Sequence, residues 1–199
     1  FADDLEQVLK NADEAGIKQI LTIGCDLQSS AKSVALAGRY SCIHAAVGIH
    51  PHDAPEATTE GLALLESLLS APKVVAVGEI GLDFFRNRAP HDQQREAFRQ
   101  QIRLARKFNK PIIVHDREAH AEVLQILREE GAEQIGGVLH CFSGDLEMAR
   151  ACLDLGFYLS FTGNITYPKN TALREVVAGI PIDRMLIELG DPFIGQFFV

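Results

Sequence analysis

Apolar residues follow two patterns that alternate along this chain. In residues 5–15 they recur at i, i+3, i+4 and i+7, which predicts an amphipathic helix. Asp3 or Asp4 would be its N-cap, and Gly16 would end it. In residues 20–24 the apolar residues form a short continuous run, which is typical of a strand covered on both faces. The chain repeats this order of helix and buried strand.

Seven such apolar runs predict seven strands. They cover residues 20–24, 45–50, 74–80, 111–115, 137–142, 157–161 and 185–189. Strands of this kind, separated by amphipathic helices, favour a parallel sheet with helical crossovers. We therefore predict one α/β domain over residues 1–199, a TIM-type (β/α)8 barrel that lacks a strand. An open doubly wound sheet is the alternative.

The longest helical pattern, residues 92–108, carries charge on one side. Phe98 and Ile102 fall on its apolar face. Arg95, Arg99 and Arg103 fall on another face, and the simplest interpretation is a stripe exposed to solvent.

Composition narrows the classes of function. Of 199 residues, 47% are hydrophobic and 23% are charged, which excludes a disordered chain. The 19 basic residues against 27 acidic ones give a net charge of −8, which argues against a protein that coats duplex nucleic acid through a basic face. A short or single-stranded nucleic acid is compatible with this charge if a metal ion supplies positive charge locally.

The cysteines and the ends of the chain predict its environment. The 4 cysteines show no C-x-x-C spacing, so we expect reduced thiols in an intracellular protein. No apolar run approaches the ~20 residues that span a bilayer, and no basic segment precedes an apolar one as in a signal peptide. We expect a cytoplasmic protein without membrane contact. Because the chain starts at Phe1 and closes on the apolar residues 195–199, we also expect a fragment truncated at both ends.

Polar residues close several of the predicted strands. His50, Glu79, His115 and His140 stand at the ends of four successive runs. The carboxyl ends of parallel strands meet on one rim of a barrel, so we expect these side chains to converge. A buried carboxylate costs several kcal/mol unless it is paired or binds a metal ion, and imidazole nitrogens beside it suit zinc or another transition metal. Together they favour a metal site.

Singly, each of these residues also has a structural interpretation. His115 or His140 could be a strand-end histidine bonded to a loop, and Glu79 could pair with Arg117. His50 and His52 form a rival pair of ligands, although the prolines around them favour a loop in which a histidine contacts substrate or caps a turn.

Four further residues are weaker candidates. Arg117 could hold phosphate oxygens by bidentate bonding, and Ser143 could do so beside a glycine at a helix start. Asp83 could position a loop or accept a proton, and an Asx turn is an equal alternative. Cys141 lies between His140 and an apolar neighbour, so strand alternation predicts that it points away from the site and packs.

Five segments, taken together and in this order, resemble the TatD family of metal-dependent deoxyribonucleases, within the amidohydrolase-like barrels. They are Gly48-Ile49-His50-Pro51-His52, Gly78-Glu79-Ile80-Gly81-Leu82-Asp83, Pro111-Ile112-Ile113-Val114-His115-Asp116-Arg117, His140-Cys141-Phe142-Ser143-Gly144 and Ser160-Phe161-Thr162-Gly163-Asn164. The resemblance extends over nearly the whole chain.

The resemblance implies a TIM-type barrel with up to two divalent ions that hydrolyses phosphodiesters, often from the 3′ end of DNA. It implies that Glu79 bridges the ions and that His115 and His140 complete the ligands of the second ion. The ions, Mg, Mn or Zn, would activate water and stabilise charge on the phosphate oxygens. DNA ends or short single-stranded DNA would be the substrate, with His50, Arg117 and Ser143 as substrate-binding candidates.

Two departures from the family pattern matter. The family's first strand carries a His-x-His pair of ligands, and this chain begins at the helix that follows that strand. Where the family has a Glu-Thr-Asp-x-Pro-like segment, residues 188–192 read Glu-Leu-Gly-Asp-Pro, so Gly190 takes the place of the Asp ligand and Asp191 comes one residue late. We therefore expect one ion rather than two, and unpaired strand edges where the barrel would close.

Three hypotheses about function follow. The first is a TatD-like 3′-5′ nuclease whose activity is impaired in this chain. The second is a metal-dependent hydrolase of another small substrate on the same barrel, because related barrels hydrolyse amides, lactones and phosphotriesters. The third is a non-catalytic remnant or binding module.

Overall fold

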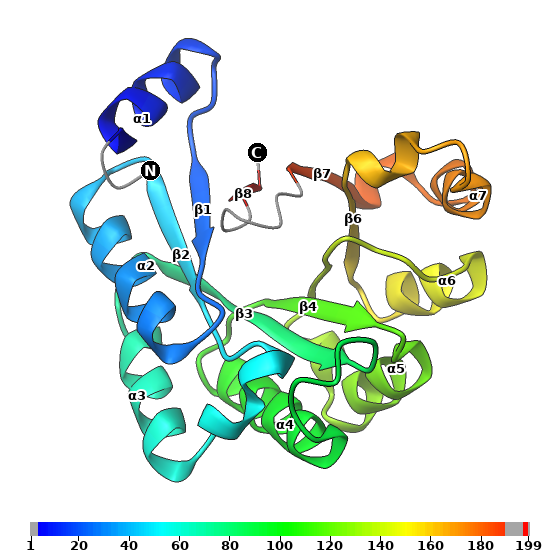
Figure 1. The fold of residues 1–199 in the computed structure, drawn as a ribbon, viewed down its shortest axis with the longest axis horizontal. Coiled ribbons are helices and arrows are strands. Elements are labelled where there is room, and N and C mark those ends of the chain that lie inside the picture. The colour runs from blue at the N-terminus through cyan, green and yellow to red at the C-terminus, as the bar shows by residue number, and fades with distance from the viewer. Residues whose placement is uncertain (1–3, 190–196, 199) are drawn as a thin grey trace.

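The computed structural model describes residues 4–189 and 197–198. Their eight strands form one sheet in the order β1 to β8 (Figure 1). The strands are β1 (Ile20–Ile23), β2 (Ile43–Val47), β3 (Val74–Asp83), β4 (Ile112–Arg117), β5 (Gly137–Leu139), β6 (Tyr158–Phe161), β7 (Met185–Leu189) and β8 (Phe197–Phe198). Neighbours from β1 to β7 are parallel, and β8 is antiparallel to β7.

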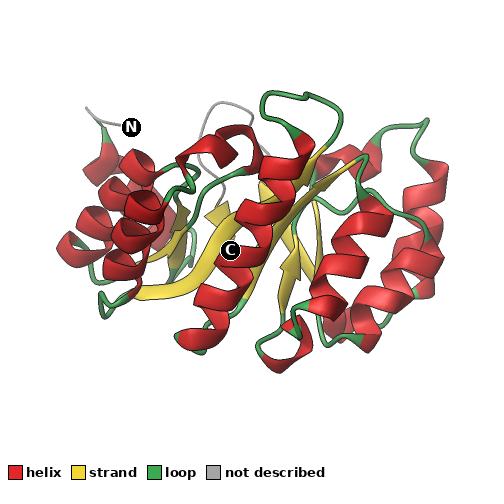
Figure 2. Ribbon diagram, turned by 90° about the horizontal axis from the view of Figure 1, so that it is seen from below, coloured by secondary structure: helices red, strands yellow, loops and turns green. Residues whose placement is uncertain are grey.

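The helices lie along the outer side of the curved sheet (Figures 1 and 2). The α-helices are α1 (Leu5–Glu14), α2 (Leu27–Arg39), α3 (Thr59–Leu69), α4 (His91–Lys107), α5 (His120–Glu129), α6 (Leu146–Asp154) and α7 (Thr171–Gly179), and the short 3-10 helices are η1 (Pro51–Glu56), η2 (Ala132–Gln134), η3 (Gly163–Thr166) and η4 (Ile182–Arg184). A doubly wound sheet would carry helices on both faces, so the prediction of a TIM-type barrel is confirmed and the open alternative is wrong.

Local sequence signals set where the helices begin and end. Asp26 caps α2 by accepting the backbone N–H of Ser29, whose hydroxyl in turn accepts the N–H of Asp26. Asp4 occupies the predicted N-cap of α1 but makes no capping bond through its side chain. Gly16 follows that helix with a φ of 89°, which favours glycine.

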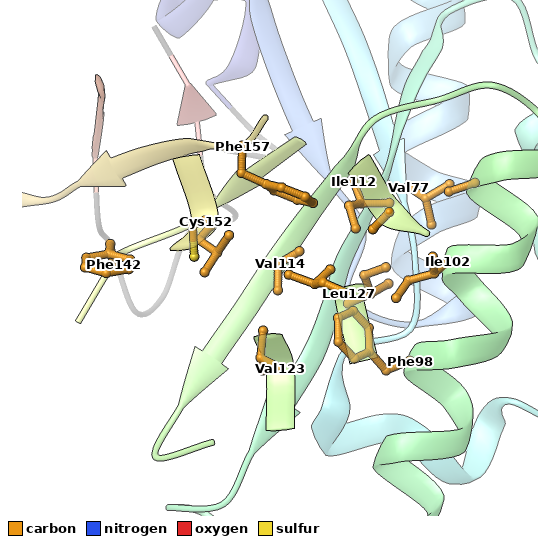
Figure 3. Close-up of a cluster of buried hydrophobic side chains, with 14 of the residues drawn as sticks. Val77, Phe98, Ile102, Ile112, Val114, Val123, Leu127, Phe142, Cys152 and Phe157 are labelled. Carbon is orange, nitrogen blue, oxygen red and sulfur yellow. The ribbon is translucent and has the colours of Figure 1, made fainter. Parts of the chain in front are cut away.

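The main apolar core lies between the helices and the outer face of the sheet. Phe98 and Ile102 of α4 pack there with Val77, Ile112 and Val114 of the strands (Figure 3). All five side chains are completely buried. Burial of each contributes about 1.5–3 kcal/mol, so this layer fixes the strands that carry the polar rim.

A smaller apolar cluster lines the inner face of the sheet. It contains Ile23, Ala46, Ala76, Ile113 and Val138. Because side chains alternate along a strand, the residue two positions beyond a member of this cluster faces the same interior. The alternation thus directs the strand-end residues that follow toward the inside of the curve.

Two expectations about the fold are only partly met. We expected unpaired edges at the first and last predicted strands; β7 pairs with β8, whereas β1 pairs only with β2 among the described strands, with β8 nearby. We also expected the arginines of α4 to be solvated; their side chains are partly exposed, but they also form a ladder of ion pairs with α5 and the residue after it. The pairs are Arg95–Glu122, Arg99–Glu129, Arg99–Glu130 and Arg103–Glu130.

Two expectations about the environment of the protein concern its cysteines and its helices. None of the four cysteines forms a disulfide. Within residues 4–189 and 197–198, no helix is both long enough and apolar enough to cross a membrane.

Candidate metal centre

Strand ends bring a group of histidines and carboxylates to one rim of the sheet. His50 follows β2, Glu79 lies in β3 and His115 in β4, and His140 follows β5. Backbone hydrogen bonds between strand ends hold this rim together. The N–H of His50 donates to Cys25 O (2.7 Å), that of Glu79 to Gly24 O (3.1 Å) and that of His140 to Val114 O (2.9 Å).

Two glycines let the strands approach closely just before these residues. A Cβ at Gly48 would lie 2.8 Å from the carbonyl carbon of Gly78, and a Cβ at Gly78 would lie 2.5 Å from Cβ of Ile113. Any side chain at either position would push β2, β3 and β4 apart. The glycines therefore allow the polar rim to close around Glu79.

Glu79 lies at the centre of the group. Its side chain is buried, and its Oε1 atom lies 2.8 Å from His115 Nδ1, 3.2 Å from His140 Nε2 and 3.7 Å from His50 Nε2. The ligand-capable atoms of His50, Glu79 and His115 all lie within 4.8 Å of one another. The structure thus brings together the residues predicted as ligands, and it places His50 beside them.

Two of these rings each contact a further carboxylate through the ring nitrogen that faces away from Glu79. His115 Nε2 lies 3.2 Å from Asp83 Oδ2, and His140 Nδ1 lies 3.0 Å from Glu188 Oε2. Glu188 Oε1 also accepts hydrogen bonds from the hydroxyl of Ser160 (2.8 Å). Each ring is therefore held between Glu79 and an outer carboxylate, an arrangement that fixes the orientation of metal-binding histidines.

His50 makes a different set of contacts. Its Nδ1 accepts the backbone N–H of His52 (3.1 Å), so a neutral His50 carries its proton on Nε2, the nitrogen that faces Glu79. The ring of His52 lies beside that of His50, with centroids 4.3 Å apart, and His52 Nε2 lies 2.8 Å from Asp83 Oδ2, the oxygen that His115 also contacts. His50 therefore faces Glu79, whereas His52 reaches the centre through Asp83.

The histidines differ in their protonation. Burial lowers the pKa of His50 to about 3, so that ring is neutral at neutral pH. Burial also acts against protonation of His115, but hydrogen bonds to Asp83 and Glu79 outweigh it and raise the pKa to about 9. The pKa of His140 is likewise raised well above its ordinary value, because the two carboxylates it contacts outweigh its burial.

The carboxylates show the complementary shifts. Burial alone would raise the pKa of Glu79, but His140 and His115 outweigh it and hold that pKa well below its ordinary value. Asp83 behaves in the same way, with a pKa lowered by its hydrogen bonds to His115, to the backbone of Arg86 and to His52. The centre is therefore a compact set of opposite charges, from which a bound cation would displace the protons of the imidazoles.

Two buried glutamines of α4 support the rim. Gln101 accepts the N–H of Ile49 (2.7 Å) and donates to its carbonyl oxygen (3.0 Å), next to His50. Gln94 holds Asp83 in the same way, at 2.8 and 3.1 Å. Sequence reasoning missed both, although two glutamines among the apolar positions of an amphipathic helix were a signal for them.

The weaker candidates lie further from the centre. Arg117 is exposed, and its guanidinium carbon lies 4.1 Å from the ring centroid of Phe85, so it does not serve as the ion-pair partner of Glu79. Ser143 is exposed too, and the cap of the following helix is Asp145, which places a carboxylate where we expected a phosphate.

Cys141 and Glu188 also differ from expectation. Cys141 has a φ of 46°, and its thiol lies 3.7 Å from Thr162 Oγ1 and 3.8 Å from Asn164 Nδ2, so the expectation of apolar packing is wrong. Strand alternation fails there because β5 already ends at Leu139. Sequence reasoning used Glu188 only for alignment and missed its contact with His140. Gly190 and Asp191 lie outside the described residues.

Comparison of the sequence with known proteins finds one family and relatives named as metal-dependent hydrolases or exonucleases. The model of a family described as TatD related DNase matches residues 1–197. The chain is 44% identical over 194 residues to an uncharacterized metal-dependent hydrolase, YabD, of Bacillus subtilis, covering 98% of this chain and 76% of that protein. It is 41% identical over 196 residues to the 3′-5′ ssDNA/RNA exonuclease TatD of Edwardsiella piscicida, covering 98% of this chain and 75% of that protein.

The fold agrees with solved structures as well. The TatD homolog YJJV from Escherichia coli superposes with a TM-score of 0.87 at 34% identity, covering 94% of this chain and 72% of that one. A TatD family hydrolase from Entamoeba histolytica gives a TM-score of 0.83 at 29% identity, covering 96% of this chain and 66% of that one.

Proposed function

This chain belongs to the family of TatD-related DNases, and from that premise we propose that it is a metal-dependent hydrolase of nucleic-acid phosphodiester bonds. The observation that carries the proposal is the arrangement of two histidines around the buried carboxylate of Glu79, each tied on its far side to a second carboxylate. The relative named as a 3′-5′ ssDNA/RNA exonuclease supports single-stranded nucleic acid as the substrate.

The donor set fits one divalent ion. Glu79 offers an oxygen, His115 offers Nδ1 and His140 offers Nε2, while Asp83 and Glu188 keep the opposite nitrogens protonated. Such a mixture of nitrogen and oxygen ligands suits Mn or Zn, and Mg is the third candidate. When bound, the ion would polarise the phosphate and lower the pKa of water.

His50 takes a separate role in this proposal. Because its proton lies on Nε2, the ring donates a hydrogen bond rather than a lone pair toward the centre. With a pKa of about 3, it adds no positive charge there at neutral pH. We assign His50 to a phosphate oxygen of the substrate, and Arg117 to the neighbouring phosphate on the rim. The exposed Ser143, next to a capping carboxylate, is the weakest of the candidates for phosphate contact.

The first test is release of nucleotides from a short single-stranded DNA labelled at its 3′ end. The chain and its Glu79→Gln variant are compared with Mg, Mn or Zn added, so that a contaminating nuclease shows up in both samples. We expect metal-dependent release by the chain and loss of more than 99% of it in the variant. Equal release by both, or no release by the chain with any of the ions, would contradict the proposal.

A second pair of variants separates ligand from substrate contact. In His140→Asn, the affinity for Mn, measured by calorimetry, should fall at least tenfold. In His50→Asn the affinity for Mn should stay within about twofold of that of the unchanged chain, while KM for the oligonucleotide rises. The reverse pattern would assign the ligand role to His50.

A further inference from the structure

One aromatic ring on the rim is exposed and flanked by arginines. Phe85 lies in the loop after β3, and 53% of its surface is exposed. The guanidinium carbon of Arg117 lies 4.1 Å from its ring centroid, and that of Arg86 lies 5.6 Å away. Both distances fall within the range of cation–π contacts, so the ring and the two cations form one unit.

Hydrogen bonds tie this unit directly to the candidate metal centre. Asp83 Oδ1 accepts the backbone N–H of Phe85 (3.0 Å) and of Arg86 (2.7 Å), while its other oxygen contacts His115. Phe84, the residue directly after Asp83, donates its N–H to the carbonyl oxygen of Arg117 (2.9 Å). This bond fixes the end of β4 against the loop. The exposed ring is therefore held two residues from a carboxylate of the centre.

The neighbouring residue of the same loop, Phe84, packs against the protein itself. The ring of Phe84 stacks on His91, with centroids 3.9 Å apart and planes at 15°, and Arg95 lies over it at 5.3 Å. Phe84 is thus used to fasten the loop onto α4. Phe85 is not needed for that contact and presents its ring to solvent on the rim.

Charge favours an anionic ligand at this place. The chain carries a net charge of −8, yet the exposed Arg86 and Arg117 both lie beside the ring of Phe85. An aromatic face combined with arginines is the combination that binds single-stranded nucleic acids, because a base stacks on the ring and the guanidinium groups hold phosphates. In a duplex the bases are stacked on one another and cannot reach such a ring.

We propose that Phe85, with Arg117 and Arg86 beside it, is a stacking platform for a nucleobase of the single-stranded substrate, next to the metal centre. The inference rests on the proposed hydrolysis of nucleic acids and adds to it a positioning role for the base. It makes the nucleobase, and not the phosphate backbone alone, part of what the rim recognises.

The test compares two substrates that differ only in their bases. One is a short oligothymidylate, and the other is an oligomer of equal length built of abasic tetrahydrofuran units, both labelled at the 5′ end. Hydrolysis is measured with Mn for the chain and for Phe85→Leu. In the unchanged chain kcat/KM should be about 5- to 150-fold higher for the oligothymidylate, which is the range for one base stacked on an aromatic ring. In Phe85→Leu this ratio should fall close to one, mainly through KM.

A matched control exists at the opposite end of the sheet. Tyr158, the first residue of β6, is 39% exposed and lies 5.2 Å from the guanidinium carbon of Arg184. Tyr158→Leu removes a comparable aromatic–arginine pair and should keep the ratio of the unchanged chain.

The outcomes separate the platform from the proposed function. A ratio near one in the unchanged chain, or a ratio that Phe85→Leu leaves intact, overturns the platform while the nuclease proposal stands. If the unchanged chain cleaves neither oligomer, the proposed function itself fails and the platform with it.

Salt dependence tests the arginines independently of the ring. A phosphate contact in a single strand contributes about 0.7 to the slope of log affinity against log salt concentration. The corresponding slope for KM of the oligothymidylate should therefore shrink by about 0.7 in Arg117→Gln and stay unchanged in Arg184→Gln. An unchanged slope in Arg117→Gln would remove that arginine from the platform.

Discussion

Two groups of opposite charges stand out in this molecule, and they differ in the cation that each uses. In the candidate metal centre the carboxylates Glu79, Asp83 and Glu188 contact imidazoles. In the ladder between α4 and α5, Glu122, Glu129 and Glu130 contact arginines. An arginine keeps its proton at any pH a protein meets, whereas an imidazole can give its proton up.

The surroundings of the two groups differ as well. The side chain of Glu79 is 4% exposed and that of Glu188 is completely buried, whereas those of Glu122 and its partner Arg95 are 39% and 38% exposed. Buried charges are costly unless each finds a partner, so the centre gains little stability for its cost. The comparison teaches that the ladder serves packing of two helices, while the centre keeps exchangeable protons where a metal ion can replace them.

The largest effect is expected when a histidine of the candidate metal centre is substituted, and a histidine outside the centre serves as the control. His115 and His120 each contact an aspartate, at 3.2 and 2.9 Å. His115→Asn should weaken Mn binding, measured by calorimetry, by more than about 100-fold, because it removes a ligand rather than an outer partner. His120→Asn should leave that affinity unchanged. Equal losses in the two variants would erase the distinction between the centre and its surroundings.

The next effect concerns the outer carboxylate of His140. Glu188→Gln keeps the shape of the side chain but weakens its bonds to His140 Nδ1 and to the N–H of Cys141 (2.6 Å). Loss of such an outer partner typically costs 10- to 100-fold in metal affinity or activity, and we expect a loss in that range. The measurement is Mn affinity together with nucleotide release. A variant as active as the unchanged chain would make Glu188 a structural residue.

The sequence was informative about the fold because both faces of the strands are apolar. Runs such as 74–80 and 111–115 were predicted as strands that end in polar residues, and the parallel topology placed those ends on one rim. The pairing of β7 with β8 could not be found in this way, because a two-residue antiparallel strand leaves no periodic pattern.

Parts of the site escaped sequence reasoning for physical reasons. Convergence of Glu79, His115 and His140 follows from strand ends alone. The tautomer of His50 depends on a backbone N–H two residues away, and the contact between His140 and Glu188 joins residues 48 positions apart. Neither has a local signature. The ion pairs of the arginine ladder were not predicted because helix periodicity shows which residues share a face but not which helix lies opposite.

Within the ladder, substitution of Glu130 should lower the free energy of unfolding more than substitution of Glu122. Its side chain is 9% exposed and accepts two hydrogen bonds from Arg103 (2.8 and 2.7 Å) and one from Arg99 (3.1 Å). Glu130→Gln should lower the free energy of unfolding by about 1–3 kcal/mol at pH 7, measured by urea denaturation.

The loss of stability caused by Glu130→Gln should depend on pH, and the pKa of Glu130 gives the direction of this dependence. Hydrogen bonds from Arg103 lower the pKa of Glu130 below 4.5 in the folded chain. The carboxylate therefore adds its full stability above about pH 4.5, and that contribution is lost as the pH falls toward the folded pKa. The difference between the unchanged chain and Glu130→Gln should shrink over that window. A difference that grows on acidification would contradict the assignment.

The smallest effect is expected at the exposed end of the ladder. Arg95 contacts Glu122 through two nitrogens, but both side chains are more than one third exposed, so water and salt screen the pair. Exposed pairs contribute about 0–1 kcal/mol, and Glu122→Gln should lower the free energy of unfolding by no more than that. The loss should become smaller still in about 1 M NaCl, whereas that of the more buried Glu130→Gln should persist. If Glu122→Gln proved the more destabilising of the two, burial would not be what ranks the pairs of this ladder.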